Sequence, residues 1–282
     1  MIDRTFPSRA LTGEVQWELL VESLVRRSSL AAGTYWRVAP TYHRWTHDAG
    51  TDVWDAPLDP FAIRRVDPDR VRRFTGRPYP PWRDRQSSFG TVRGGDWDRR
   101  PPLPGDGYEL HRRLYLADRF EESTLHGSFR AHFVDGVPWT RTQLVRELFA
   151  ALDCDADRVW HGCTSRSDVL DRCERLDRLY ETIASDGYRT QLELARAGGD
   201  PGVPGEPARG FLNALEHEIV VDIGRDGTVL FVSGRHRLSI AKLLGLETVP
   251  VVVAVRHVKW MDRRDAAFRG ETTRPHPDLP SQ

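Results

Sequence analysis

A short basic segment stands where an apolar run is followed by a helical pattern. Its members, which we call the box, are Ser233, Gly234, Arg235, His236 and Arg237. The apolar run before the box predicts a strand, and the pattern after it predicts a helix over residues 238–244 that ends at Gly245. Backbone N–H groups at a helix start lack intrahelical partners, and the helix dipole is positive there. The box therefore predicts an anion site, most simply for phosphate.

Basic residues near a helix start also have a simpler interpretation. Arg235, His236 and Arg237 would then be solvated side chains on an exposed helix start, with no ligand. Such an arrangement is unfavourable for the helix dipole unless an anion is present. The spacing alone leaves both interpretations open.

Four carboxylates are candidates for the proton transfer or metal binding that phosphate chemistry needs. They are Glu218 and Asp222, on the strand that leads toward the box, and Asp96 and Asp98, on either side of Trp97. Glu218 or Asp222 would serve as the base for an acceptor hydroxyl. The second pair follows two glycines, which is typical of a loop whose carboxylates act as an acid/base pair or as metal ligands. An Asx-stabilised turn anchored by a buried tryptophan has the same pattern.

The elements that must hold the box are marked by their composition. Two β-branched runs, residues 218–223 and 228–232, flank an Asp-Gly turn and predict a hairpin that ends at the box. A third apolar run, residues 249–255, predicts a strand that is buried on both faces. Another strand is expected at residues 61–66, before an Asp-Pro turn.

Helical periodicity appears at four places outside the box. The segments are residues 13–29, 108–120, 142–152 and 168–185. In the last of them, Ser167 is the expected N-cap and Gly187 the expected end. Residues 32–59 are rich in aromatic side chains and give no firm prediction, and residues from 261 onward are expected to form a surface tail.

The composition of the chain limits the kinds of partner and cellular compartment that can be expected. Acidic and basic residues balance at 41 each, so no overall field favours nucleic acid or a membrane surface. No apolar run approaches the ~20 residues of a membrane span, and the N-terminus lacks a signal-peptide core, so a cytoplasmic protein is expected. Cys154, Cys163 and Cys173 have no Cys-x-x-Cys spacing. A zinc site that includes His161 is conceivable, but no metal site is firmly predicted.

Residues 234–251 resemble the signature of the ParB/sulfiredoxin superfamily. In that superfamily a Gly-x-(His or Arg)-Arg box opens a helix and a Gly-Leu-x-x-Val-Pro-Val segment follows, as in GRHRLSIAKLLGLETVPV here. Two further segments fall in the right order. Residues 179–191 are similar to the helix and glycine-containing turn that precede the box, and residues 61–68 to the first strand. The resemblance covers about residues 60–70 and 175–257.

The resemblance implies an α+β fold, with a ParB/sulfiredoxin-like mixed sheet and packed helices, to which N-terminal and inserted helical segments are added. The implied divisions are an N-terminal extension over residues 1–59, a domain over residues 60–257 with an insertion at about 71–174, and a C-terminal tail over residues 258–282. An insertion of that length would either cover the box or build a separate site.

The resemblance also implies nucleotide handling, because members of the superfamily bind ATP, ADP or CTP with the phosphates on the box and the helix start. By position, Gly234, His236 and Arg237 match the phosphate-binding residues. The residues that match the loop that helps to hold nucleotide in ParB are Gly187, Tyr188 and Gln191. Arg235 stands where sulfiredoxin has its catalytic cysteine and ParB a glutamate, which excludes sulfinic acid reduction. Ser233 replaces the acidic residue before the glycine in the amino-acid kinase branch, and no helix-turn-helix pattern follows the last strand.

The leading hypothesis is a nucleotide-binding enzyme that transfers a phosphoryl group to a small-molecule acceptor or hydrolyses a nucleoside triphosphate. ATP, ADP or CTP is the expected cofactor, and Mg²⁺ would accompany it. The alternative is a non-catalytic ParB-like module that binds nucleic acid through a basic strip, or a ParB-like nuclease. The arginines of this strip are Arg70, Arg72, Arg73, Arg77, Arg83 and Arg85. The acceptor, the preferred nucleotide and the oligomeric state are left open.

Overall fold

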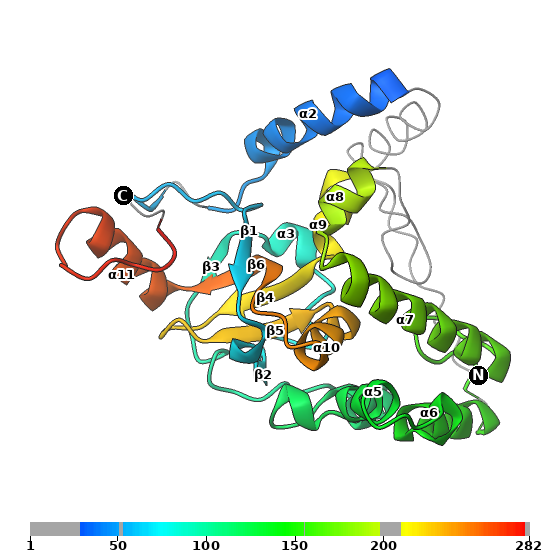
Figure 1. Ribbon diagram of the computed structural model, residues 1–282. Coiled ribbons are helices and arrows are strands. Elements are labelled where there is room, and N and C mark those ends of the chain that lie inside the picture. Colours follow the sequence, from blue (N-terminus) through cyan, green and yellow to red (C-terminus); the bar gives the residue numbers. More distant parts are fainter. Residues whose placement is uncertain (1–28, 51–52, 155, 198–209, 280–282) are drawn as a thin grey trace.

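The computed structural model describes the whole chain except residues 1–28, 51–52, 155, 198–209 and 280–282. The described part is an α+β structure built on one six-stranded mixed sheet (Figure 1). Neighbouring strands follow the order β1-β6-β4-β5-β2, and β3 pairs with β6 beyond the end of β1. The expected α+β class with a mixed sheet is confirmed at this level.

The three central strands are the apolar runs that the sequence marks. They are β4 (Ile219–Ile223), β5 (Val229–Ser233) and β6 (Val249–His257). β4 is antiparallel to β5, as the predicted hairpin requires, and parallel to β6. All nine residues of β6 are buried, which confirms a strand covered on both faces. The remaining strands are short: β1 (Ile63–Val66), β2 (Arg73–Phe74) and β3 (Thr91–Arg93).

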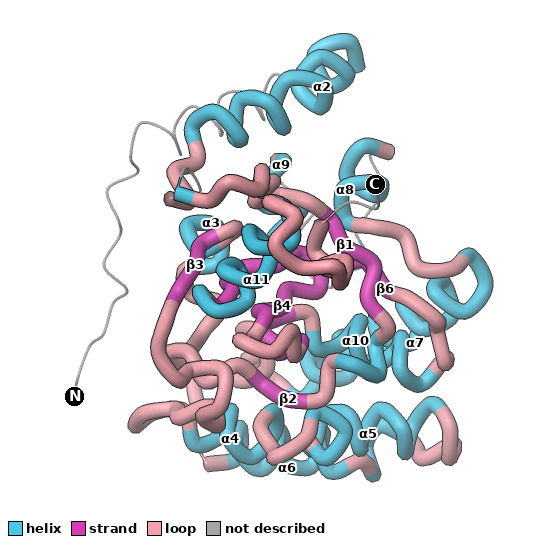
Figure 2. Tube along the Cα trace, turned by 90° about the vertical axis from the view of Figure 1, so that its left-hand side faces the viewer, coloured by secondary structure: helices cyan, strands magenta, loops and turns pink. Residues whose placement is uncertain are grey.

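Helices cover both faces of the sheet. α10 (Arg235–Leu243) packs on one face through Leu238 and Ala241. The other face is covered by α8 (Gln191–Arg196), α9 (Phe211–Glu216) and, outside them, α2 (Ser29–Thr46). A second helical layer lies beyond α10, on the side of the sheet away from α2 (Figures 1 and 2). Its members are α4 (Glu109–Tyr115), α5 (Thr124–Phe133), α6 (Gln143–Asp153) and α7 (Arg166–Asp186).

This helical layer has an apolar core that is separate from the core of the sheet and that includes one residue of the box helix, Ile240. Leu144 and Leu148 of α6, Phe129 of α5 and Leu176 of α7 are fully buried together with Ile240 of α10. The box helix is therefore held between the sheet and the helical layer, and its position depends on both.

Periodicity predicted three of the helices in this layer. The segments expected at residues 142–152 and 168–185 are confirmed as α6 and α7. The segment expected at residues 108–120 contains α4, which already ends at Tyr115. The N-cap of α7 is Ser165 rather than Ser167, because Ser165 and Asp168 exchange hydrogen bonds with each other's backbone N–H in a capping box. Gly187 ends the helix with φ +79, as expected.

Other helices lie where periodicity predicts none. α2 contains Pro40 and α5 contains Gly127, and both residues interrupt the helical signal. The short α3 (Arg85–Ser88) also went unpredicted, as did α8 and α9. The helix expected at residues 13–29 lies outside the described residues, apart from its last residue. No helix in the described part of the chain is both long and apolar enough to cross a membrane.

The C-terminal residues do not form the expected surface tail. α11 (Val258–Phe268) buries Trp260 and Met261, and the chain that follows it returns to the sheet. Asp278 is 4% exposed, and its Oδ2 lies 2.6 Å from Nε of Arg256 in β6. The prediction was wrong because a buried ion pair, which local composition does not reveal, holds this segment in place.

The expected insertion at about 71–174 is not separable from the sheet. β2 and β3 both belong to it and pair with β5 and β6, respectively. Its expected end falls inside α7, which continues without a break from Arg166 to Asp186. The insertion therefore supplies sheet edges and half of a helix as well as the helical layer.

Candidate functional site

The box lies at the turn between β5 and α10, where the backbone requires glycine. Gly234 has φ +91, and a Cβ at this position would lie 2.8 Å from Cα of Ile219 in β4. The helix begins at Arg235, so the three basic residues occupy its first turn, as was expected for His236 and Arg237. The predicted order of strand, tight turn and helix is confirmed.

Gly234→Ala is expected to lower the free energy of unfolding by roughly 2–3 kcal/mol, because it combines a left-handed backbone with a steric clash. Gly245→Ala is the matched control: its φ is +64, but an added Cβ meets no described atom within 4 Å. The control is expected to lose roughly 1 kcal/mol, from the backbone alone. Urea unfolding of both variants measures the difference, and equal losses would show that the approach of β4 imposes no requirement for glycine.

Aromatic rings enclose Arg235. Its guanidinium carbon lies 4.0 Å from the ring centroid of Tyr115 and 5.2 Å from that of Trp82. Burial lowers the pKa of the guanidinium, and Nη1 has no hydrogen-bond partner among the described residues. Arg237 is 6% exposed. The interpretation of the box as solvated side chains on an exposed helix start is therefore wrong.

His236 is a neutral imidazole held by two aromatic residues. The distance from Nε1 of Trp160 to Nε2 of His236 is 3.2 Å, and the ring of Phe129 stacks on the imidazole at a centroid distance of 5.8 Å. Burial, followed by nearby positive charges, holds the pKa of His236 well below its usual range. The residues that carry these charges are His161, Arg172, Arg235 and Arg237. An indole N–H only donates, so Nε2 accepts and the proton of His236 is on Nδ1.

Glu218, the residue before β4, lies beside Arg237, and its side chain is fully buried. Its Oε1 accepts a hydrogen bond from the backbone N–H of Gln191 at 2.5 Å. Burial raises the pKa of Glu218 to about 7, although the charge of Arg237 and backbone N–H groups oppose the shift. Within the described structure, neither Oε2 of Glu218 nor Nη1 of Arg237 has a hydrogen-bond partner.

The turn after α7 lies next to Arg237 and Glu218. Tyr188 is within electrostatic reach of both, and burial raises the pKa of its hydroxyl. The structure thus brings the turn from Gly187 to Gln191 to the box. Seven buried polar atoms in and around these segments have no partner among the described residues: Oη of Tyr188, Oε1 of Gln191, Oε2 of Glu218, Oγ of Ser233, Nη1 of Arg235, Nη1 of Arg237 and Oγ of Ser239. Because buried polar atoms are nearly always hydrogen-bonded, such a concentration marks a candidate ligand site.

Asp222 is not brought to this site. Its carboxylate pairs with Arg77, with 2.7 Å between Oδ2 and Nε, and both side chains are buried. Oδ1 also accepts the backbone N–H of Val255 at 3.0 Å, where the pairing of β4 with β6 shifts register. Asp222 therefore joins two strands and an arginine, which leaves Glu218 as the candidate base on this side of the sheet.

Asp96 and Asp98 also lie away from the box, at the other end of the β4-β5 hairpin. Oδ1 of Asp96 is 2.7 Å and Oδ1 of Asp98 is 2.8 Å from Nη2 of Arg225, which stands in the hairpin turn. Burial alone would raise the pKa of Asp98, but hydrogen bonds from Arg225 outweigh it and lower the pKa to about 2. Trp97 is buried, so this loop has the character of the anchored turn that was one of the two interpretations.

Comparisons with known proteins give no information about this site, so its assignment depends on the geometry of the structure alone. No family model, curated protein or solved structure matches this chain. The residues that the structure brings together are the box, Glu218 and the turn from Gly187 to Gln191.

Sequence reasoning missed the aromatic side chains around the box. Tyr115, Phe129 and Trp160 come from separate segments of the insertion, and Trp160 precedes His236 by 76 residues. No local pattern connects such distant positions. The one available signal was the presence of aromatic residues within a segment that was expected either to cover the box or to build a separate site.

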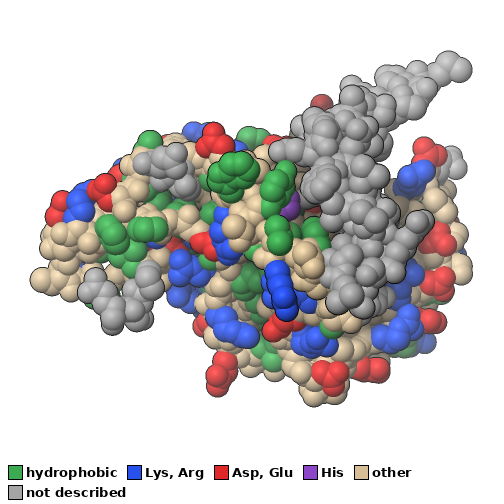
Figure 3. Space-filling model, turned by 90° about the horizontal axis from the view of Figure 1, so that it is seen from above, with side chains coloured by type: hydrophobic (Ala, Val, Ile, Leu, Met, Phe, Trp, Pro, Cys, Tyr) green, Lys and Arg blue, Asp and Glu red, His purple; other side chains and the backbone are tan. Residues whose placement is uncertain are grey.

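The basic strip proposed for nucleic acid is interrupted. Arg77 is 4% exposed and paired with Asp222, whereas Arg70, Arg72 and Arg73 are exposed. Arg83 is exposed and donates to the hydroxyl of Tyr108, and the side chain of Arg85 lies outside the described residues. Figure 3 shows a different face, the one on the side of α2, and there basic and acidic side chains are interspersed rather than gathered by sign. The strip therefore presents fewer positive charges to one surface than its sequence suggested.

Two of the three cysteines behave as core residues. Cys163 and Cys173 are buried, and Cys154 is exposed. Burial raises the pKa of Cys173 to about 12 and also raises that of Cys163, so both thiols stay protonated. Among the described residues, no group of three or more His, Cys, Asp and Glu side chains could hold a metal ion.

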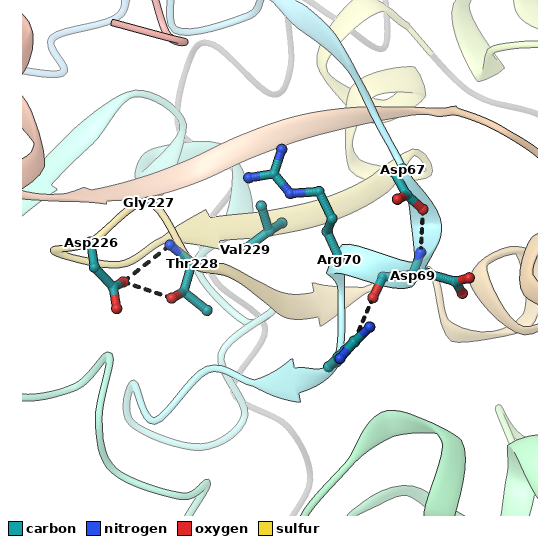
Figure 4. Close-up of a pocket in the computed structure, with 8 residues that line it drawn as sticks. Asp67, Asp69, Arg70, Asp226, Gly227, Thr228 and Val229 are labelled. Atoms are coloured by element: carbon teal, nitrogen blue, oxygen red, sulfur yellow. Dashed lines mark hydrogen bonds between the residues drawn. The ribbon is translucent and has the colours of Figure 1, made fainter. Parts of the chain in front are cut away.

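A shallow pocket at the edge of the sheet is distinct from the box. It is lined by Asp67, Asp69, Arg70, Arg72, Asp226, Gly227, Thr228 and Val229. Figure 4 shows that Asp226 accepts hydrogen bonds from the backbone N–H and the hydroxyl of Thr228, while Asp67 accepts one from the backbone N–H of Asp69. Two of its carboxylates therefore stabilise local turns, and this pocket offers no counterpart to the concentration of buried polar atoms at the box.

Proposed function

We propose that the chain binds ATP, ADP or CTP with the phosphates on the box, and transfers the terminal phosphoryl group to a small-molecule acceptor or to water. The observation that carries this proposal is the burial of Arg237 beside Glu218, each with a polar atom that lacks a partner among the described residues. Glu218 lies within electrostatic reach of Arg237, but no ion pair joins these two side chains in the described structure, and a buried guanidinium N–H without an acceptor is unfavourable. Phosphate oxygens match its planar set of donors.

Glu218 is the base in this proposal. With a pKa of about 7, a substantial fraction of its carboxyl groups is ionised at neutral pH, and the conjugate acid is weak enough to retain a proton. The backbone N–H of Gln191 holds Oε1 and leaves Oε2 to accept the proton of an acceptor hydroxyl or water. Arg237 and Arg235 would stabilise the charge on the phosphoryl oxygens as transfer proceeds.

His236 has a different role from the arginines. Because its imidazole is neutral, it adds no charge to the site and acts instead as a hydrogen-bonding group of defined orientation. The hydrogen bond from Trp160 occupies Nε2 and leaves the N–H at Nδ1 as its donor. His236 is thus proposed to orient the ligand, while Arg235 and Arg237 neutralise its charge.

Two further considerations support the proposal. The box, the preceding turn and the mixed sheet agree with the resemblance to the ParB/sulfiredoxin superfamily, whose members bind nucleotides at this position. Mg²⁺ that accompanies phosphates needs few protein ligands, and Oε1 of Gln191 is a buried oxygen atom without a described partner that fits such a role. The ion would supply additional neutralisation of phosphate charge.

Isothermal titration tests the proposal directly. The protein is titrated with ATP, ADP and CTP in the presence of Mg²⁺, and at least one nucleotide is expected to bind. Arg237→Met keeps most of the buried volume but removes the donors, and is expected to weaken binding by about tenfold to hundredfold, as for a lost charge-assisted hydrogen bond.

Arg178→Met is the matched control, because Arg178 is exposed on α7. It is expected to bind nucleotide as the unsubstituted protein does. If no nucleotide produces heat, or if Arg237→Met and Arg178→Met bind equally well, the proposal fails.

A further inference from the structure

The chain that follows α11 ends in a short buried segment, although the residues before that segment are exposed. Every residue from 269 to 275 is exposed, whereas His276 and Asp278 are only 8% and 4% exposed. Figure 1 shows this chain as an open loop beside α11. Two buried side chains at alternate positions therefore fix the end of an exposed linker. We call residues 276–279 the anchor segment.

Three arginines from three different elements converge on Asp278. Nε and Nη2 of Arg256, in β6, lie 2.6 Å from Oδ2 and 3.3 Å from Oδ1. Nη2 of Arg64, in β1, lies 3.1 Å from Oδ1, and Nε of Arg264, in α11, lies 3.9 Å from Oδ2. Burial alone would raise the pKa of Asp278, but the charges of the three arginines outweigh it and lower the pKa. The carboxylate is therefore ionised and directly paired.

The same surroundings also contact the backbone and the imidazole of the anchor segment. The backbone carbonyl of Asp278 accepts hydrogen bonds from Nη2 of Arg64 at 3.1 Å and from Nε of Arg264 at 3.3 Å. The ring of His276 lies against Trp260 of α11, with 4.2 Å between centroids. Hydrogen bonds to the main chain combined with sites for alternate side chains are typical of peptide recognition. We call the three arginines and Trp260 the arginine pocket.

The charges of the arginine pocket require an acidic occupant. Among the described residues, Asp278 is the only carboxylate that pairs with any of the three arginines. The side chains of Arg256 and Arg264 are each 2% exposed. Even with the anchor segment in place, Nη1 of Arg256 and Nε of Arg64 lack a described hydrogen-bond partner. Removal of the segment would leave buried guanidinium groups without their counter-ion, which is strongly unfavourable. The pocket therefore selects a segment that carries a carboxylate.

The linker contributes little to holding the anchor segment. The backbone N–H groups of Gly270 and Glu271 close the last turn of α11. Arg269 pairs with Asp55, but the two side chains are 43% and 59% exposed, and an exposed ion pair stabilises by at most about 1 kcal/mol. The strong contacts of the anchor segment are thus those with the arginine pocket, and they do not depend on which copy of the chain supplies the segment.

We propose that the arginine pocket is a peptide-recognition site whose ligand is the anchor segment, and that a second copy of this chain can supply that segment in exchange. The segment of a second copy makes the same contacts, so exchange replaces an intramolecular contact with an identical intermolecular one. The linker gives the resident segment an effective concentration of about one millimolar, so exchange between copies is expected at high protein concentration. This site is independent of the function proposed for the box.

Fluorescence anisotropy with a labelled peptide of residues 271–279 tests recognition on the full chain. The unsubstituted protein is expected to bind the peptide weakly, because its own segment competes. Asp278→Asn in the protein weakens that competitor and is expected to tighten peptide binding at least tenfold, as for a lost charge-assisted hydrogen bond. The same substitution in the peptide is expected to weaken binding at least tenfold. Asp262→Asn, on the exposed surface of α11, is the control and is expected to leave peptide affinity unchanged.

A second form of the experiment applies if Asp278→Asn does not fold, as judged by circular dichroism. A specific protease site is placed within the exposed residues 271–274, so that the full chain folds before it is cut. The cut segment is expected to exchange with the labelled peptide. In the cut protein, Arg64→Met is expected to weaken peptide binding at least tenfold, whereas Arg65→Met, exposed on the same strand, leaves it unchanged.

Sedimentation equilibrium tests the exchange between copies. A dimer is expected to appear as the protein concentration approaches about one millimolar, and an excess of the peptide is expected to dissociate it. Peptide affinity that responds neither to Asp278→Asn nor to Arg64→Met would overturn the recognition site. A chain that stays monomeric at that concentration, or a dimer that the peptide leaves intact, would overturn the exchange with a second copy.

Discussion

Glu218→Gln is expected to lower the rate of phosphoryl transfer or hydrolysis by about 10²–10⁴-fold while leaving nucleotide affinity nearly unchanged. Glutamine has almost the same shape and can still accept the N–H of Gln191 at Oε1, but it cannot take up a proton. Steady-state kinetics with the nucleotide found by titration measures the rate, and titration of the variant measures the affinity. A variant with full activity would show that Glu218 is not the base.

The pH dependence of this reaction follows from the same carboxyl group. A general base acts in its ionised form, so kcat/KM is expected to rise with pH through an apparent pKa near 7, the value to which burial raises the pKa of Glu218. Glu174→Gln, on the exposed surface of α7, is the control and is expected to keep both the rate and the pH profile.

Stability should change with pH in the opposite direction. The pKa of Glu218 is raised from 4.5 to about 7 in the folded protein, so the folded state binds its proton more tightly than the unfolded chain does. This contribution to stability is fully present below pH 4.5 and is lost as the pH rises through 7, which corresponds to about 3 kcal/mol. Glu218→Gln removes this dependence, so urea unfolding at pH 5 and pH 8 should show the variant gaining relative stability at the higher pH.

Asp222→Asn is expected to lower the free energy of unfolding by about 3–5 kcal/mol. The substitution keeps the side-chain shape and an oxygen for the N–H of Val255, but it leaves the buried guanidinium of Arg77 without its counter-ion. Since a domain is typically stable by about 5–15 kcal/mol, this loss would be readily detected by urea unfolding.

The exposed pair of Asp153 and Arg166 is a matched control for the buried pair. Its atoms approach to 2.6 Å, but its side chains are 56% and 59% exposed. Asp153→Asn is therefore expected to cost at most about 1 kcal/mol. The double variant Arg77→Met with Asp222→Asn should lose less than the two single variants together, because no uncompensated charge is left. Additive losses would contradict the account of Asp222 as the counter-ion of Arg77.

The sequence allowed the sheet and the box to be predicted because their signals are local. β4, β5 and β6 are apolar runs bounded by glycine turns, and the box stands directly after one of them. The strand-turn-helix pattern already predicted a tight turn at Gly234. The structure adds the reason for glycine at this position, which is its left-handed backbone and the close approach of β4. Elements with a continuous period of their own could therefore be placed to within a few residues.

The partners of individual charges could not be predicted in the same way. Asp222 pairs with Arg77, 145 residues away, and Asp98 pairs with Arg225, 127 residues away. At the sequence level, Asp222 and Glu218 were equal candidates for a base, since both stand near the same strand. Only the three-dimensional packing distinguishes the two. It pairs the carboxylate of Asp222 with Arg77, and it buries Glu218 with an oxygen atom that has no described hydrogen-bond partner.

Periodicity also fails where a helix is held mainly by its neighbours. α5 contains a glycine and three polar or charged positions in its last turns, yet Leu125 and Phe129 are buried in the helical layer. Tertiary packing outweighs intrinsic propensity in such segments. The same holds for the C-terminal chain, whose position depends on Asp278 rather than on any local pattern.

The continuity of α7 has a consequence for any shortened form of this chain. Its 21 residues span about 30 Å and carry Arg172 toward one end and the turn of Gly187 at the other. Excision of residues 71–174 would cut this helix, remove the apolar layer under α10 and take two strands from the sheet. A shortened chain would therefore need another surface against which to pack the box helix.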